Sequence, residues 1–352
     1  MRFMRAGLPI SVEPRTPRRG EVLFRTMDSR VPTTGREYTD EEIRSFVEDL
    51  ESLPGGDLTV ALLVGCGQRA VAPLRDFLLN GKPRGVFQPR QHAVEALGQL
   101  AAKEVLMEYL FRRQVIPDAV VRFGEEAVES TAARELARWH TEEVFQFLLE
   151  LGKKRMLAGV VDAVGEFDRP EAIAVLLKAL EDDVCRPIAE EAVRRIAART
   201  KPQLFRTARA ESKGLEEKPS ELQKRRSVVR ILSELEFSEA EWGELRPLLE
   251  DRDEEIAMMV AEIAVDWAPA KEKETAAQSL VDYLGRAHWF MQIRIQDCFC
   301  RNYPQVREVL EKASAQRRRR VQGNPLADPV FRMLERVQSK AEKFQRRENA
   351  SA

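Results

Sequence analysis

The side chains best suited to chemistry are few in this chain. Its 352 residues include three histidines and four cysteines. His92, His140 and His288 are far apart in sequence, and none belongs to a His-Glu-x-x-His pattern or to another spacing that binds zinc on a helix. No glycine-rich phosphate loop, dinucleotide fingerprint or nucleophile elbow occurs either. We therefore expect no catalytic residue, no metal site and no cofactor.

One pair of cysteines is close enough in sequence to be considered as metal ligands. Cys298 and Cys300 flank Phe299, and His288 precedes them. On a helix, residues two apart point about 200° away from each other, which makes a poor chelate. We expect Phe299 to be a core residue with a structural cysteine on either side. Four cysteines in so long a chain also do not make a disulfide framework.

The elements that must position these side chains are predicted to be helices. The chain is 43% hydrophobic, 33% charged and only 7% aromatic. Abundant Ala, Leu, Glu and Arg with apolar residues at spacings of three and four indicate amphipathic helices with much charged surface. No alternating β-branched run is bounded by a hairpin turn, so strands are not expected.

Charge is distributed unevenly along the chain. The formal net charge is −1, yet residues 1–36 hold eight arginines against three acidic residues, and residues 312–347 hold eleven Lys and Arg against three. The remainder is therefore acidic, and the basic ends could attract an acidic partner. No signal peptide and no stretch of about 18–20 apolar residues is present. These absences predict a cytoplasmic protein with no membrane association.

A short phrase of small, apolar and charged residues recurs through the chain, as in PRQHAVEALGQL at 89–100 and GVVDAVGEF at 159–167. An apolar residue near the end of each copy serves as an anchor, and successive anchors are 28 to 39 residues apart. The anchors are Val64, Leu97, Leu136, Val164, Ile196, Leu232, Ile263 and Cys298. Such a drifting period is typical of stacked helical hairpins whose turns absorb the differences in length.

The copy at 155–183 shows the internal pattern of one unit. Its first half has apolar residues at helical spacing, with Gly159 and Gly165 allowing a neighbouring helix to approach closely. Asp168-Arg169-Pro170 forms the turn, and a second apolar stripe follows in the second half. Neither helix can cover its apolar stripe alone, so the units are expected to stack.

These features resemble HEAT repeats. The Ala-Leu-Gly phrase at 96–98, the Ala-Val-Gly phrase at 163–165, the turn at 168–170 and the Ala-x-x-x-Leu-Leu-x-x-Leu pattern at 172–180 are most similar to the short bacterial repeats of phycobilisome-lyase type. The similarity covers roughly 57–312. It implies an all-α fold: a right-handed, armadillo-like α-solenoid of about eight hairpins with N- and C-terminal extensions. Such arrays serve many functions, so the resemblance names no partner.

The sequence predicts five segments. Residues 1–38 form a loosely attached or disordered basic arm, with Val22-Leu23-Phe24 as a possible anchor. Residues 39–56 form a capping helix that begins with a capping box at Thr39 and Glu42. The repeat array covers 57–313, a basic linker 314–327, and an amphipathic helix 328–347 that either caps the array or binds a partner.

The predicted function is a non-catalytic scaffold that binds a protein partner on its concave surface, with oligomeric state left open. Helical phase places exposed polar residues of the second helices on that surface. These candidate contacts are Arg75, Glu143, Gln146, Lys178, Arg206, Arg209, Glu241, Glu244 and Gln278. A basic cluster, Arg317, Arg318, Arg319 and Arg320, is a further candidate contact.

Two alternatives follow from the resemblance. The first is a bilin-lyase-like factor for chromophore attachment, in which Trp139, Trp242, Trp267 and Trp289 could line a tetrapyrrole pocket or could simply be interior packing. The second is a HEAT-like nucleic-acid-binding or DNA-repair protein, which needs a continuous basic groove. Residues 201–213 are net positive, but 168–183 and 238–254 are negative. The basic termini are therefore the main support for nucleic-acid binding.

Overall fold

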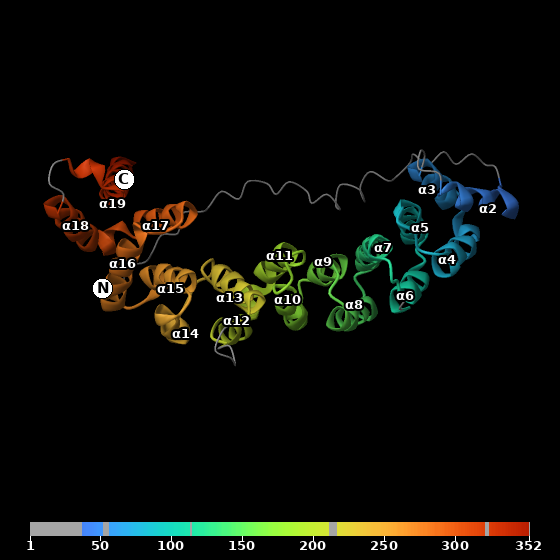
Figure 1. Cartoon of the computed structure of the whole chain (residues 1–352), viewed down its shortest axis with the longest axis horizontal. Helices are drawn as coiled ribbons and strands as arrows, with labels where there is room; N and C mark the ends of the chain where they lie inside the picture. The colour runs from blue at the N-terminus through green and yellow to red at the C-terminus, as the bar shows by residue number, and fades with distance from the viewer. Residues whose placement is uncertain (1–36, 52–55, 113–114, 211–216, 321–323, 352) are drawn as a thin grey trace. The chain divides into compact units, whose positions relative to one another are not determined.

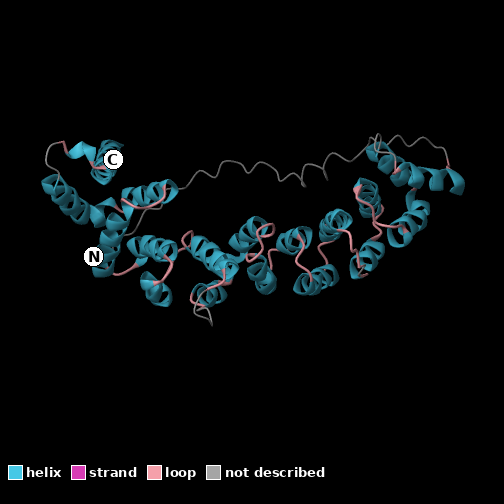
Figure 2. Ribbon diagram, viewed as in Figure 1, coloured by secondary structure: helices cyan, strands magenta, loops and turns pink. Residues whose placement is uncertain are grey.

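All regular secondary structure in the described part of the protein is helical. A computed structural model describes residues 37–51, 56–112, 115–210, 217–320 and 324–351, with side chains described up to Lys343. These ranges contain 18 α-helices and five short 3₁₀ helices and no strand (Figure 2). The prediction of an all-α fold is confirmed. The predicted arm at 1–38, including Val22-Leu23-Phe24, lies outside the described residues except for its last two positions.

The chain divides into two compact units, with the boundary between Val128 and Glu129 inside helix α7 (Ala119–Ala137). The first unit contains α2 (Asp40–Asp49), α3 (Gly56–Gly65), η1 (Gly67–Ala70), α4 (Val71–Asn80), α5 (Gln88–Gln99) and α6 (Lys103–Phe111). Here α3 and α4 both pack against α5, and α5 packs against α6. The predicted array at 57–313 thus includes parts of both units.

The second unit continues the same order of helices. It contains α8 (Glu142–Lys154), α9 (Ala158–Glu166), η2 (Pro170–Ala172), α10 (Ile173–Ala179), α11 (Arg186–Ile196), η3 (Ala197–Arg199), α12 (Lys201–Ala208), α13 (Pro219–Leu232), α14 (Glu239–Leu245), η4 (Arg246–Glu250), α15 (Glu254–Trp267), α16 (Ala270–Leu284), α17 (Trp289–Arg301), α18 (Tyr303–Arg320), η5 (Pro325–Ala327) and α19 (Pro329–Ser351). Within this unit α9, α11, α13 and α15 form one row, and α8, α10, α12 and α14 form another (Figure 1). Most helices pack against the next helix or the next but one in sequence, as α17 does against α19.

The anchor residues mark the helices that the periodicity predicts. All eight lie in odd-numbered helices from α3 to α17, and seven of them are buried. The exception is Val64, which is half-buried while the preceding Leu63 is buried in its place. In the first copy of the phrase, the buried anchor position is therefore one residue earlier than the periodicity predicts.

Glycines permit the closest helix contact, as the sequence predicts. A Cβ atom added to Gly159 in α9 would lie 2.1 Å from the backbone oxygen of Ser130 in α7. At Gly165 an added Cβ would lie 2.7 Å from the Cβ of Ala192 in α11. Both helices that flank α9 therefore approach it too closely for a larger residue at these positions.

The ends of the described chain differ in how well they match the prediction. Thr39 and Glu42 form the expected capping box at the start of α2. At the other end, α18 continues to Arg320, so residues 314–320 are helical where a linker was expected. Ala and Arg are strong helix formers, and cations near a helix C-terminus interact favourably with its dipole, which explains the longer helix. Residues 321–323 lie outside the described ranges, and α19 begins at Pro329.

Replacing Gly159 by Ala tests the close packing of α7 and α9. We expect Gly159→Ala to lower the free energy of unfolding by about 3 kcal/mol, because the new methyl group meets backbone atoms that cannot move alone. Gly243→Ala on α14 is the matched control, since no atom lies within 4 Å of its added Cβ. That variant should gain about 0.5–1 kcal/mol from reduced chain entropy. Urea unfolding followed by circular dichroism measures both, and equal stability of the two variants would contradict the packing.

Candidate functional site

Several of the predicted contact residues are engaged in ion pairs between helices. Arg75 on α4 donates to both carboxylate oxygens of Glu108 on α6, from Nη2 at 2.8 Å to each and from Nε at 3.0 Å to Oε2. Arg209 at the end of α12 pairs with Glu244 on α14, with 2.6 Å between Nη2 and Oε2. The structure thus brings together two residues of the predicted set. Their charges are already compensated within the chain.

Glu241 has two structural contacts of its own. Its carboxylate accepts the Ser238 backbone N–H at 2.8 Å, which completes a capping box on α14, and pairs with Lys201 of α12 at 2.9 Å. These hydrogen bonds lower the pKa of Glu241, with the Ser238 N–H as the main cause and Lys201 as the second. Glu241 therefore fixes the start of α14 and connects it to α12.

The remaining predicted contacts have local partners or face solvent. Gln146 bonds to Glu142 at 2.9 Å and Gln278 to Asp282 at 3.0 Å, each within one helix. Lys178 on α10 reaches the backbone oxygen of Lys153 on α8 at 3.4 Å. Arg206 bonds only weakly to its own helix, at the Pro202 oxygen. Glu143 is exposed on α8.

The spacing of the inter-helix ion pairs matches the spacing of the repeats. Arg75 and Glu108 are 33 residues apart, Arg134 and Asp162 28, Arg294 and Glu262 32, and Arg194 and Glu234 40. Because equivalent positions on successive hairpins are one repeat apart, such pairs join neighbouring hairpins. Arginine and glutamate at this spacing are a sequence signal that periodicity of apolar residues alone does not detect.

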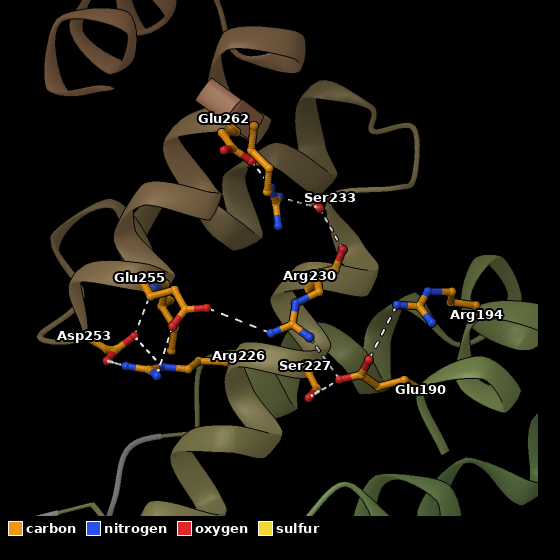
Figure 3. Close-up of polar contacts among 11 residues, drawn as sticks. Glu190, Arg194, Arg226, Ser227, Arg230, Ser233, Asp253, Glu255 and Glu262 are labelled. Atoms are coloured by element: carbon orange, nitrogen blue, oxygen red, sulfur yellow. Dashed lines mark hydrogen bonds and ion pairs between the residues drawn. The ribbon is translucent and has the colours of Figure 1, made fainter. Parts of the chain in front are cut away.

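A continuous polar network crosses four helices on the α9–α15 row and its continuation, α17 (Figure 3). We call it the first-helix network. It consists of Glu190 and Arg194 on α11, Arg226, Ser227 and Arg230 on α13 with Ser233 at its end, Asp253, Glu255 and Glu262 at or on α15, and Arg294 on α17.

The bonds of this network alternate between arginines and carboxylates. On one side, Glu190 accepts from Ser227 at 2.6 Å and from Arg230 at 3.3 Å. On the other, Arg226 pairs with Asp253 at 2.6 Å and with Glu255 at 2.9 Å (Figure 3). Since every arginine of the network has a carboxylate partner, none is left to bind a phosphate. The network connects helices; it offers no free cation.

Glu262 is the most enclosed carboxylate of the network. Its Oε2 atom accepts from Arg294 at 2.6 Å, and Arg294 also reaches Ser233 at 3.3 Å. The Oε1 atom is buried and has no hydrogen-bond partner. Burial raises the pKa of Glu262 above its ordinary value, and the Arg294 charge opposes this effect only in part.

The histidines and cysteines occupy separate sites. His92 lies 3.9 Å from Asp57, His140 packs against Phe167, and His288 is exposed beside Trp289. Phe299 is buried, as expected, and so is Cys298, whereas Cys300 is half-buried on another face of α17. Among the described residues, no group of three or more histidine, cysteine, aspartate or glutamate side chains could hold a metal ion.

The tryptophans do not share one environment. Trp242 is buried, and its Nε1–H donates to Glu272 at 2.9 Å; Trp267 packs against Phe237. Trp139 is half-buried at the end of α7. Trp289 is 63% exposed, so it is neither interior packing nor the lining of an enclosed pocket.

The exposed apolar surface around Trp289 is the clearest candidate for binding. Phe290 and Ile293 on the same helix are also exposed. A cavity of about 200 Å³ begins beside Ile293 and lies between α17 and α19. Sequence reasoning missed this surface, because tryptophan in a helical repeat is usually buried.

The basic cluster at the end of α18 is partly structural. Arg317 pairs with Asp328 at 3.1 Å, and Asp328 in turn accepts the N–H groups of Val330 and Phe331 at the start of α19. The guanidinium of Arg318 lies 5.5 Å from the centre of the Phe331 ring. Arg319 and Arg320 are exposed. Two of the four arginines therefore stabilise the connection between α18 and α19.

Comparison with known proteins identifies no family. Neither a scan against models of protein families nor a search of curated proteins finds a match to this chain. Within the residues that the structure describes, none of the helices is long and apolar enough to cross a bilayer.

Stability measured against pH tests the environment of Glu262. Because folding raises its pKa, the native state binds this proton more tightly than the unfolded chain. Its contribution to stability is therefore largest below the ordinary Glu value of 4.5 and declines as pH rises to the folded pKa. Glu262→Gln should remove this decline, so its unfolding free energy should fall less with pH than that of the wild type.

Glu241→Gln serves as a control, because the pKa shift of Glu241 is opposite in direction to that of Glu262. The pKa of Glu241 is lowered, so the wild-type side chain stabilises the fold above pH 4.5 and loses this effect as pH falls through the folded pKa. This variant should lose stability mainly at neutral pH. Parallel pH profiles for wild type and Glu262→Gln would show that Glu262 is not protonated more easily in the native state.

Proposed function

We propose that this protein is a non-catalytic scaffold that binds a protein partner. In this proposal about eight HEAT-like hairpins, α3–α4 to α17–α18, stack into a right-handed α-solenoid. The recurring anchors, the sequential packing of the helices and the ion pairs at repeat spacing support the stacking. Interactions that reach mostly the next hairpin suit an extended binding surface.

The observation that carries the proposal is the exposed aromatic surface on α17. Trp289, Phe290 and Ile293 are 63%, 51% and 47% exposed. Contiguous exposed apolar side chains on a folded protein mark interaction sites, and tryptophan and phenylalanine are enriched at the centres of protein interfaces. Met291 and Ile295 on the same helix are buried, so the exposure of apolar side chains is confined to one face.

The exposed polar residues of the second helices, which the sequence predicts as partner contacts, are only partly available for a partner. Four of the predicted contact residues already form ion pairs within the chain: Arg75, Arg209, Glu241 and Glu244. The proposed contacts on this side are Glu143, which is exposed, and four residues that make no inter-helix ion pair in the described structure: Gln146, Lys178, Arg206 and Gln278. Partner selection there would depend on hydrogen bonding and shape more than on net charge.

The alternatives have weaker support. Nucleic-acid binding needs unpaired cations in a row, but Arg209 pairs with Glu244, and the arginines of the first-helix network are all compensated. Arg319 and Arg320 remain its main support. A tetrapyrrole site would need several tryptophans around one cavity, whereas Trp242 and Trp289 differ completely in exposure.

Affinity capture and DNA titration together test the proposal. The immobilised full-length protein should retain a protein from a nuclease-treated lysate of its native cells, in an amount that saturates and that free full-length protein displaces. Duplex DNA should bind more weakly than about 10 μM at moderate salt, as expected for non-specific contacts. Tight DNA binding that falls in an Arg206→Ala/Arg209→Ala variant, or capture that nuclease abolishes, would instead favour a nucleic-acid-binding protein.

A further inference from the structure

The exposed apolar residues of α17 form a stripe along one face. Trp289 and Ile293 are four residues apart, and Phe290 and Ile293 three, so the three side chains lie on adjacent positions of the first turns. The rings of Trp289 and Phe290 meet edge to face, with centroids 6.0 Å apart. This contact holds both rings together at the surface, where they present a preformed apolar area.

The stripe leads directly into a cavity between α17 and α19. The cavity measures about 200 Å³ and is lined by Ile293, Gln296, Asp297 and Cys300 of α17 and by Arg336, Val337 and Lys340 of α19. Ile293 belongs to both the stripe and the cavity wall. The volume suits an inserted side chain and is below the roughly 300 Å³ at which sites for drug-sized ligands begin.

Two observations fix how α17 and α19 lie against each other. Lys340 on α19 pairs with Asp297 on α17 at 3.2 Å, and Arg336 of α19 lines the same cavity as Ile293 of α17. The members of each pair are 43 residues apart, so the chain runs in the same direction in both helices. Arg332 is therefore level with Trp289, one turn before Arg336 on α19.

The α19 side of this surface carries uncompensated positive charge. Arg332 and Arg336 are exposed, and neither forms an ion pair with a carboxylate in the described part of the chain. Lys340 is neutralised by Asp297 at the far end of the cavity. We call the whole surface, from Trp289 to Cys300 on α17 and from Arg332 to Lys340 on α19, the α17–α19 groove. It combines an apolar wall with a basic edge.

We propose that the α17–α19 groove binds an amphipathic helix of a protein partner. Large apolar residues of that helix pack against Trp289, Phe290 and Ile293, one of them entering the cavity, and acidic residues on its flank face Arg332 and Arg336. This is helix-in-groove recognition, in which spaced apolar anchors supply affinity and charge complementarity supplies selectivity. The inference rests on the proposed scaffold function and names the partner chemistry for one of its surfaces.

The charge pattern separates this occupant from others. The N-terminal segment of the chain is itself basic, with eight arginines against three acidic residues at 1–36, so its charge matches that of the groove edge and is not complementary to it. A bilayer surface would favour a protruding apolar face, whereas the stripe here continues into a concave cavity. An acidic partner helix satisfies both the charge and the shape.

Two designed peptides of about 18 residues test this occupant, since a helix of that length covers five turns. Both carry leucine at helical spacings of three and four; one has glutamate and the other lysine at the flanking positions. Fluorescence anisotropy with the full-length protein should show at least tenfold tighter binding of the acidic peptide. Trp289→Ala and Ile293→Ala should each weaken it about tenfold, and Arg332→Glu/Arg336→Glu should reverse the preference between peptides.

Val184→Ala is the matched control, because Val184 is 72% exposed in the same unit and lies away from α17 and α19 in sequence. It should bind the acidic peptide like the wild type. Circular dichroism checks that each variant keeps its helical content. No saturable binding, or equal binding by wild type and Trp289→Ala, would overturn the proposal.

Other occupants give distinguishable results. Binding to phosphatidylserine vesicles that Trp289→Ala abolishes, without peptide binding, would identify a membrane surface. Self-association in sedimentation experiments that Trp289→Ala abolishes would identify a second copy. No peptide binding by the wild type, with binding that appears only after Val22, Leu23 and Phe24 are replaced by serine, would identify the chain's own arm as the occupant. Each overturns the partner-helix assignment, whereas continued protein capture from the lysate by Trp289→Ala would leave the scaffold function intact.

Discussion

The helices in the described part of this chain can bury their apolar side chains only against one another, and the structure depends on this constraint. The buried anchors, such as Leu97 in α5 and Leu136 in α7, lie on faces that adjacent helices cover. Burial of apolar surface is the main favourable term in folding, and here the helix that supplies it is usually the next in sequence. Close approach at Gly159 and Gly165 maximises this contact in α9. The stability of each helix therefore depends on the helices that pack against it.

The same constraint accounts for the unusual charge content. One third of the residues are charged, yet the formal net charge is only −1. Ion pairs one repeat apart, including Arg75 with Glu108 and Arg134 with Asp162, place opposite charges on facing positions of adjacent helices. Pairs that are partly exposed add little stability individually, but they disfavour incorrect pairing of similar helices. The first-helix network extends this arrangement across α11, α13, α15 and α17 (Figure 3).

The sequence predicted the helices better than the surface. Apolar periodicity located the anchor helices, and the capping box at Thr39 and Glu42 was read correctly, because both signals are local. The helical state of Arg317–Arg320 was missed, since a run of four cations suggests a linker although each residue favours helix. Exposure of Trp289 could not be read from the sequence, because it depends on which face of α17 contacts α19. The pairing of Arg209 with Glu244 could not be predicted for a similar reason, because it depends on how α12 and α14 are aligned in three dimensions.

Small-angle X-ray scattering of the full-length protein tests the proposed stacking of hairpins most directly. A compact globule of this length has a radius of gyration of roughly 20 Å. Hairpins stacked in sequence predict a clearly larger radius, together with a cross-section about two helices thick. A radius near the globular value, with a symmetric distribution of interatomic distances, would contradict the stacked arrangement and the extended binding surface that depends on it.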